Sequence, residues 1–145
     1  MRIRIAQKKD IQEITSLNRR YFKERGRDWK TLISAKTSEM FVLEIENEII
    51  GFSGLQFHAW NNSARIIDIF VHPEFRKKGY GEQLVRFALK RAHQEKCRVL
   101  FAEAPSKNAV LKLYKKCGFR KCGYNDRYYS NSGKEIAIFL AKDLK

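Results

Sequence analysis

The chain has 145 residues, of which 43% are hydrophobic, and its 30 Lys and Arg residues outnumber its 16 Asp and Glu residues. This length fits a single domain, residues 1–145, and the apolar share excludes a disordered chain. No apolar run approaches the roughly 20 residues that span a bilayer and no hydrophobic signal core follows Met1, so we expect a cytoplasmic protein without a membrane partner.

The first half of the chain is predicted to contain a strand, two helices and a β-hairpin, over residues 2–6, 10–25, 28–37, 40–45 and 49–57. Asp10 and Glu13 have the spacing of a capping box at the start of the first helix, and Gly26 is a stop signal at its end. Residues 46–48 form the hairpin turn.

The second half is predicted to contain a buried-type strand, a helix, a strand, a helix and a final hairpin, over residues 65–71, 80–95, 98–104, 108–117, 119–129 and 135–144. Gly118 ends the second of these helices. The order contains no repeat, linker or low-complexity segment. It predicts a mixed α/β protein with one central sheet.

Residues 70–85, FVHPEFRKKGYGEQLV, lead from an apolar strand through three cations and two glycines into a helix. The first amides of a helix lack intrahelical partners and favour an anion, and glycines let the backbone approach a phosphate closely. The pattern is neither a P-loop nor a dinucleotide fingerprint. Taken alone it also fits a solvated turn, whereas its position between strand and helix favours a pyrophosphate site.

This stretch resembles the acetyl-CoA-binding motif, [RQ]-x-x-G-x-[GA], of the GNAT superfamily of N-acetyltransferases. IRIAQKKDIQEITSL is similar to the opening strand and helix of that family, and NAVLKLYKKCGF to its motif ending LY-x-x-x-GF. The resemblance implies a single-domain α/β GNAT fold. Its features are a mixed, mostly antiparallel sheet of about seven strands, a splay between the fourth and fifth strands, and about four flanking helices.

The resemblance also implies an acyltransferase enzyme that takes acetyl-CoA, releases CoA and uses no metal. Its cofactor contacts would be the strand residues Ile69, Phe70 and Val71 at the pantetheine, and the amides of the loop at the pyrophosphate, from Arg76, Lys77, Lys78, Gly79, Tyr80 and Gly81. Asn108 resembles a cofactor-contacting asparagine of the family, although it stands one residue closer to Tyr114 than is usual. Tyr114 would be the general acid that protonates the leaving thiolate, and the Val71 amide would polarise the thioester carbonyl.

The acceptor is a primary amine that attacks the thioester directly. Glu103 lies where ribosomal-protein N-terminal acetyltransferases carry a glutamate base, with Asp68 and Glu44 as weaker candidates. Tyr128 and Tyr129 match a tyrosine pair that lines the peptide groove in the N-terminal protein acetyltransferases. This branch favours a protein N-terminal α-amine, and a small-molecule amine (polyamine, amino sugar or amino acid) or a protein lysine remains an alternative.

The net charge of +14 exceeds what one CoA requires, which predicts weak association with an anionic assembly such as the ribosome. A different class, a CoA- or nucleic-acid-binding module without catalysis, is also open, although no helix-turn-helix, zinc-finger or RRM motif is present. Three cysteines without a CxxC pair indicate neither a disulfide framework nor a metal site. The sequence leaves a monomer and a homodimer equally open.

Overall fold

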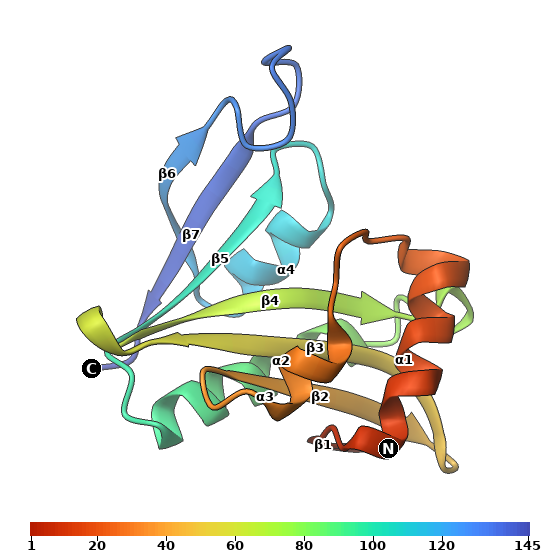
Figure 1. Cartoon of the computed structure of the whole chain (residues 1–145). Helices are drawn as coiled ribbons and strands as arrows, with labels where there is room; N and C mark the ends of the chain where they lie inside the picture. The colour runs from red at the N-terminus through yellow and green to blue at the C-terminus, as the bar shows by residue number, and fades with distance from the viewer.

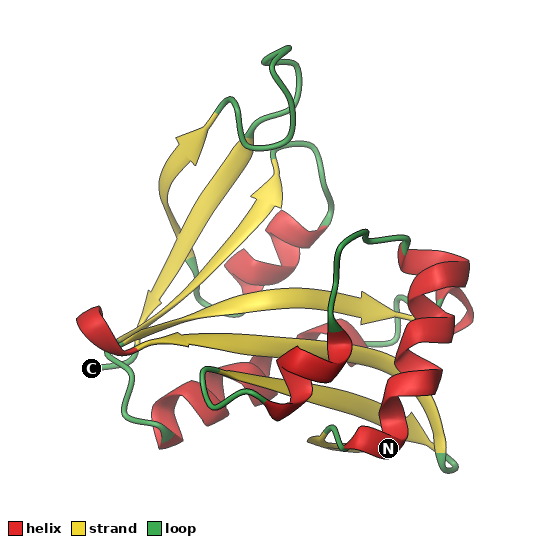
Figure 2. Cartoon of the chain, viewed as in Figure 1, coloured by secondary structure: helices red, strands yellow, loops and turns green.

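A computed structural model describes all 145 residues as seven strands and four α-helices around one sheet (Figures 1 and 2). The strands are β1 (Arg2–Ile5), β2 (Ser38–Ile45), β3 (Glu48–His58), β4 (Ser63–Val71), β5 (Val99–Pro105), β6 (Arg120–Asn125) and β7 (Ala137–Asp143). The α-helices are α1 (Ile11–Leu17), α2 (Trp29–Ser34), α3 (Tyr80–Gln94) and α4 (Val110–Lys116). No helix combines the length and the apolar character needed to cross a bilayer.

The sheet has the order β1-β2-β3-β4-β5-β7-β6, and every neighbouring pair is antiparallel except β4 and β5. Helices α1 and α2 cover one face of the sheet, where Ile14, Trp29 and Phe52 belong to one apolar core. Helices α3 and α4 cover the other face, where Ala88, Leu111 and Leu140 belong to a larger core. The predicted fold class, with about seven strands and four helices, is confirmed.

The sheet divides between β4 and β5. These strands pair only where Ser63, Ala64 and Arg65 face Val99, Leu100 and Phe101, and beyond that point they diverge into a V (Figure 1). Strand β5 continues with β7 along its whole length, so the C-terminal strands form one arm of the V and β1 to β4 form the other. The predicted splay between the fourth and fifth strands is therefore present.

The first helical segment differs from the prediction at both ends. Its first turn is a 3₁₀ turn, Lys8–Asp10, and the capping box joins Gln7 to Asp10 rather than Asp10 to Glu13. Its last turn is a π-helix, Asn18–Phe22, which ends at Lys23 in the left-handed conformation, three residues before Gly26. The Asn18 side chain exchanges two hydrogen bonds with the backbone of Glu24, which supplies the stop signal that was assigned to Gly26.

The final hairpin is shorter than predicted. Strand β6 ends at Asn125 and β7 begins at Ala137, so the predicted strand 119–129 stops four residues early and residues 126–136 form a loop. The Asn125 Oδ1 accepts a hydrogen bond from the Arg127 amide at 2.8 Å, a local bond that competes with strand pairing. Tyr128 and Tyr129 consequently belong to this loop and not to a strand.

Candidate functional site

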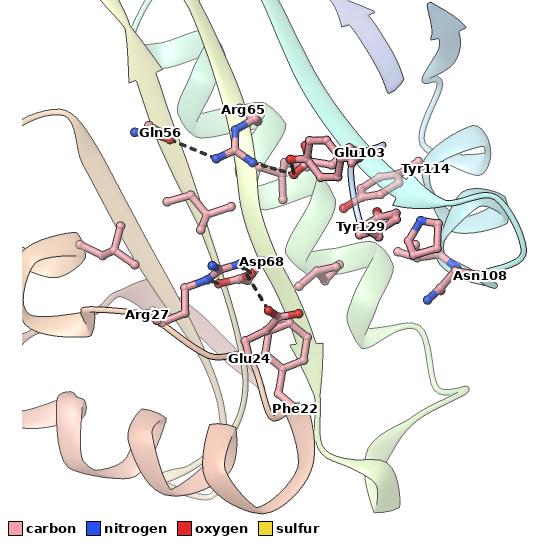
Figure 3. A pocket seen from close by; sticks show the side chains of 18 of the residues that line it. Phe22, Glu24, Arg27, Gln56, Arg65, Asp68, Glu103, Asn108, Tyr114 and Tyr129 are labelled. Carbon is pink, nitrogen blue, oxygen red and sulfur yellow. Dashed lines mark hydrogen bonds and ion pairs between the residues drawn. The ribbon is translucent and has the colours of Figure 1, made fainter. Parts of the chain in front are cut away.

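A cleft of about 740 Å³ lies where β4 and β5 diverge. Loop 23–28, β4, β5, the start of α4 and loop 126–136 all contribute to its walls. Its polar lining residues include Glu24, Arg27, Asp28, Gln56, Arg65, Asp68, Glu103, Asn108, Tyr114, Tyr128 and Tyr129 (Figure 3). The cleft therefore gathers acidic and aromatic side chains from segments that are far apart in the sequence.

The loop between β4 and α3 presents a series of unpaired peptide N–H groups. No backbone acceptor within the protein is available to the amides of Lys77, Lys78, Gly79, Tyr80 and Gly81. The Arg76 amide makes only a long contact of 3.5 Å with the Pro73 carbonyl. Free amides at the N-terminus of a 15-residue helix can bind a phosphate group, and the pyrophosphate contact expected of this loop stays a prediction.

The two glycines of this loop have different roles. Gly79 adopts φ +87°, a left-handed conformation that favours glycine, and no atom lies within 4 Å of a Cβ added there. A Cβ added at Gly81 would lie 3.2 Å from Leu113 Cδ2, so Gly81 allows α3 to pack closely against α4. Gly79 thus sets the path of the loop, whereas Gly81 sets the distance between two helices.

The cations of the loop fold back onto the protein. Arg76 Nε donates to the Val71 carbonyl at 2.8 Å, and its guanidinium lies 5.8 Å from the centre of the Phe70 ring. Lys78 Nζ lies 5.7 Å from the centre of the Phe75 ring. Arg76 and Lys78 thereby hold the loop against the end of β4 and add positive charge beside the free amides.

The edge of β4 that faces the V is open. The His72 amide donates to the Ile50 carbonyl, so the hydrogen-bonding groups of His72 point toward β3. Because successive residues of a strand alternate in this direction, those of Ile69 and Val71 point toward the V, and those of Phe70 point toward Phe52. Strand β5 does not reach them. Because Arg76 already donates to the Val71 carbonyl, the groups open to a ligand in the cleft are those of Ile69 and the Val71 amide, whereas Phe70 offers a buried side chain to the core.

Tyr114 lies on α4 at the bottom of the cleft and is 3% exposed. The Tyr114 hydroxyl makes no hydrogen bond within the protein. Because every fully buried side-chain polar atom has a partner, this hydroxyl is not fully buried and must be accessible from the cleft. Burial raises the pKa of Tyr114 above its ordinary value, and the charge of Glu103 raises it further. The phenol therefore keeps its proton across the neutral pH range.

Glu103 lies beside Tyr114, with its carboxylate directed into the cleft (Figure 3). Its Oε1 accepts two hydrogen bonds, from Arg65 at 2.6 Å and from the Tyr128 hydroxyl at 3.1 Å. Its Oε2 has no partner in the protein. One oxygen thus fixes the orientation of the carboxylate, while the other is available to a group in the cleft.

Asp68 is the second carboxylate on the strand side of the cleft, and both of its oxygens are engaged. Arg27 Nε and Nη2 each donate to one of them at 2.8 Å, and the Asp68 side chain is 4% exposed. This bidentate pair raises the pKa of Arg27 and ties loop 23–28 to β4. Glu44 lies outside the cleft and is paired with Arg4 on β1, so the structure does not support it as a base.

Tyr128 and Tyr129 reach the cleft from loop 126–136, and their rings meet edge to face at 5.1 Å. Partial burial raises the pKa of Tyr128, and it raises the pKa of Tyr129 to about 12, with a further contribution in both cases from the Glu103 charge. Both phenols are therefore hydrogen-bond donors at neutral pH, and the contact with the acceptor expected of them stays a prediction.

Asn108 lines the cleft, but its side chain is used locally. Its Oδ1 accepts a hydrogen bond from the Val110 amide at 2.9 Å, which helps to begin α4. Its side-chain amide nitrogen points away from Tyr114 in Figure 3. The cofactor contact expected of Asn108 stays a prediction.

Arg27 and Arg65 were missed in the sequence, although one signal was present. The strand RIIDIFV is apolar except for Arg65 and Asp68, and a charged residue inside a buried strand requires a partner. The partner of Asp68 lies 41 residues away and that of Arg65 lies 38 residues away. Only the folded chain identifies these partners.

The acetyltransferase (GNAT) family matches residues 8–119, which is most of the chain. The chain is 32% identical over 91 residues to the streptothricin acetyltransferase of Streptomyces lavendulae, a match that covers 62% of this chain and 48% of that protein. It therefore spans about half the length of that relative. It is 28% identical over 108 residues to a protein assigned as the [ribosomal protein bS18]-alanine N-acetyltransferase of Bacillus subtilis (strain 168), covering 74% and 70% of the two chains.

Among solved structures, a protein assigned as a streptothricin acetyltransferase of Bacillus anthracis str. Ames is similar to this chain. The TM-score is 0.75 at 30% identity, the match covers 85% of this chain and 71% of the other, and that structure contains acetyl coenzyme A. Residues 8–119, which the family matches, include the β4–α3 loop, strands β4 and β5, and Tyr114. The chain belongs to the acetyltransferase (GNAT) family.

Proposed function

We propose that this protein is an N-acetyltransferase that moves the acetyl group of acetyl-CoA to a primary α-amine, with a protein or peptide N-terminus as the favoured acceptor. The donor assignment is supported by family membership and by the free amides of the β4–α3 loop, which suit the pyrophosphate of CoA. Acetyl-CoA supplies an activated thioester, and the amine displaces its thiolate. The remaining chemistry requires a proton acceptor, a proton donor and a group that stabilises the oxyanion.

The structure offers one residue for each of these roles. Glu103 Oε2 accepts the amine proton, directly or through water, because Glu103 lies on β5, its Oε1 is held by Arg65 and Tyr128, and its Oε2 has no partner. The Val71 amide, which points into the V, stabilises the oxyanion. Tyr114 donates a proton to the departing thiolate, since burial keeps its phenol protonated.

The pairing of the cleft carboxylates is the observation that carries the choice of an α-amine. Arg27 donates to both oxygens of Asp68, and Arg65 donates to one oxygen of Glu103, so of these two carboxylates only Glu103 keeps an oxygen without a partner. A lysine amine with a pKa near 10.4 costs about 4.6 kcal/mol to deprotonate at pH 7, whereas an α-amine near 7.8 costs about 1.1 kcal/mol. The lower cost favours the α-amine as the acceptor that one carboxylate oxygen can deprotonate.

The charge of the cleft also suits an amine. Four carboxylates and two guanidinium groups line it, from Glu24, Asp28, Asp68, Glu103, Arg27 and Arg65. The cleft is thus net acidic within a chain whose formal charge is +14. A cationic acceptor is attracted to this acidic region and repelled by the rest of the surface.

A small-molecule amine is the second candidate acceptor. Two proteins to which this chain is 30% to 32% identical are named as streptothricin acetyltransferases, although the match to the curated one covers 48% of that protein. The open cleft would admit such a molecule as readily as a peptide N-terminus.

The deciding experiment measures CoA release with matched acceptors. One peptide has a free N-terminus and no lysine, and its partner has an acetylated N-terminus and one lysine; streptothricin and spermidine complete the panel. We expect the free N-terminus to give the highest kcat/KM. A higher value for streptothricin or spermidine would replace the acceptor assignment, and the absence of thiol release with every amine would overturn the enzyme assignment.

A further inference from the structure

The positive charge of the chain is concentrated at its C-terminal end. Residues 106–145 contain ten Lys and Arg but only three Asp and Glu, whereas residues 1–105 contain twenty and thirteen. Half of the net charge therefore belongs to a little more than a quarter of the chain. This segment consists of α4, β6, β7 and their loops.

Three of these cations share one face of α4. Lys112, Lys115 and Lys116 are spaced by three and four residues, which places them on the same side of a helix, and all three are exposed. The opposite side of α4 is apolar, since Leu111 and Tyr114 are buried against the sheet. Helix α4 thus presents an exclusively cationic charge to solvent.

Two further lysines extend this face across the sheet. Lys121 on β6 pairs with Leu140, which belongs to the core under α4, so Lys121 lies on the same side of the sheet as α4. The Nζ of Lys142 lies 2.9 Å from the position that a Cβ on Gly118 would take, at the turn after α4. We call the set Lys112, Lys115, Lys116, Lys121 and Lys142 the α4 basic surface.

The charges of the α4 basic surface are largely uncompensated. Lys116 makes its single salt bridge, to Glu82 at 3.4 Å, and the other four lysines make none. Elsewhere, Arg4, Arg27, Arg65 and Arg91 each have a carboxylate partner within 2.8 Å. A cluster of like charges without partners raises the local potential and favours a polyanion.

An exposed aromatic ring lies on the same side of the sheet as these lysines. Tyr124 on β6 is 69% exposed and pairs with Ile138, which packs on the same core as Leu140, so the ring is on the α4 side of the sheet. A solvent-exposed ring amid lysines provides a stacking platform for a nucleobase. Tyr124 is the only exposed large hydrophobic residue on α4, β6 or β7, so this surface lacks the apolar face that inserts into a membrane.

We propose that the α4 basic surface binds RNA through its phosphate backbone, with Tyr124 stacking on an unpaired base. The surface lies on the α3–α4 side of the sheet, while loop 23–28, which borders the acceptor cleft, lies on the α1–α2 side. Bound RNA would therefore leave the acceptor side of the cleft open. This interaction would localise the protein on an RNA-containing assembly independently of which amine it acetylates.

The test is a fluorescence anisotropy titration with a labelled single-stranded RNA of about 15 nucleotides, a length within the range contacted by one small domain. For the wild-type protein, a plot of the logarithm of the association constant against the logarithm of the salt concentration should have a slope near −3.5. Each neutralised phosphate contributes roughly −0.7 to this slope, and the surface has five lysines. Lys115→Glu combined with Lys121→Glu should weaken binding about tenfold or more, and Tyr124→Ala should weaken it severalfold.

The matched control is Lys8→Glu combined with Lys36→Glu, which makes the same change in net charge at exposed lysines outside the surface. Lys115→Gln combined with Lys121→Gln serves as a second variant with a smaller perturbation of α4. An equal loss of affinity in the control, or tighter binding to poly-glutamate or to phosphatidylserine vesicles than to RNA, would overturn the proposal. A raised KM for acetyl-CoA with unchanged RNA binding would assign these lysines to the donor instead.

Discussion

The loop proposed to bind the donor, residues 76–81 (the donor loop), and the cleft between β4 and β5 proposed to bind the acceptor (the acceptor cleft) use different groups of the protein. Loop 76–81 offers main-chain amides at the start of α3, and its side chains mainly hold the loop in place. The acceptor cleft offers side chains, and its two central carboxylates are fixed by arginines from distant segments. Main-chain recognition depends on local geometry, whereas side-chain recognition depends on which segments the fold brings together.

Tyr114 stands between the two regions, and its replacement should have the largest effect. Tyr114→Phe removes the proton donor while keeping the ring that packs on Phe119, so we expect kcat to fall about a hundredfold with little change in the KM for acetyl-CoA. Steady-state kinetics of CoA release would measure both values.

The pH profile of the wild-type enzyme tests the same role. Burial raises the pKa of Tyr114, so the phenol keeps its proton as pH rises, and kcat/KM should increase through the acceptor pKa near 8 without a falling limb below about pH 10. A falling limb at lower pH that disappears in Tyr114→Phe would show that the phenol ionises in the working range, contrary to its burial.

Breaking the Arg27–Asp68 pair should disturb the acceptor side alone. Arg27→Met leaves a buried carboxylate without its partner, and we expect a loss of about 2 kcal/mol in the free energy of unfolding together with a raised acceptor KM. Urea denaturation and acceptor titrations would measure these changes. Adding Asp68→Asn should restore part of the stability, and a raised KM for acetyl-CoA in either variant would contradict the separation of the two regions.

Substitutions at two glycines have the smallest expected effect, and they test directly whether the donor loop and the acceptor cleft act separately. Gly79 in the donor loop and Gly26 beside the acceptor cleft both have positive φ, +87° and +74°, and a Cβ at either would meet no atom within 4 Å. Alanine at either position costs about 1 to 2 kcal/mol of backbone strain. Gly79→Ala should weaken acetyl-CoA binding about tenfold in calorimetry, and Gly26→Ala should leave it unchanged. Equal effects would mean that the donor loop has no special dependence on its backbone.

The same contrast explains what could be predicted from the sequence. The donor loop could be predicted because its proposed function depends on contiguous residues, a strand end, Gly79 and a helix start. The partners of Glu103 and Asp68 were not located, because Arg65 and Arg27 are separated from them by 38 and 41 residues. Tyr128 and Tyr129 are predicted to lie in a strand, but they lie in a loop because the Asn125 side chain ends β6 early. The periodicity of the sequence does not distinguish this local side-chain bond from continued strand pairing.

The short pairing of β4 with β5 has a consequence for the protein before it meets its donor. Only three residue pairs join these strands, so the inner edges of both remain unpaired over the rest of the V. Open strand edges usually invite pairing with other chains and aggregation. Here the two edges face each other across the cleft, so each edge restricts the pairing of a strand from another molecule with the other edge, whereas a narrow, extended chain such as pantetheine can fit between them. The fold thus limits the pairing of these unpaired strand edges with other molecules of the protein and leaves the edges available to a small molecule.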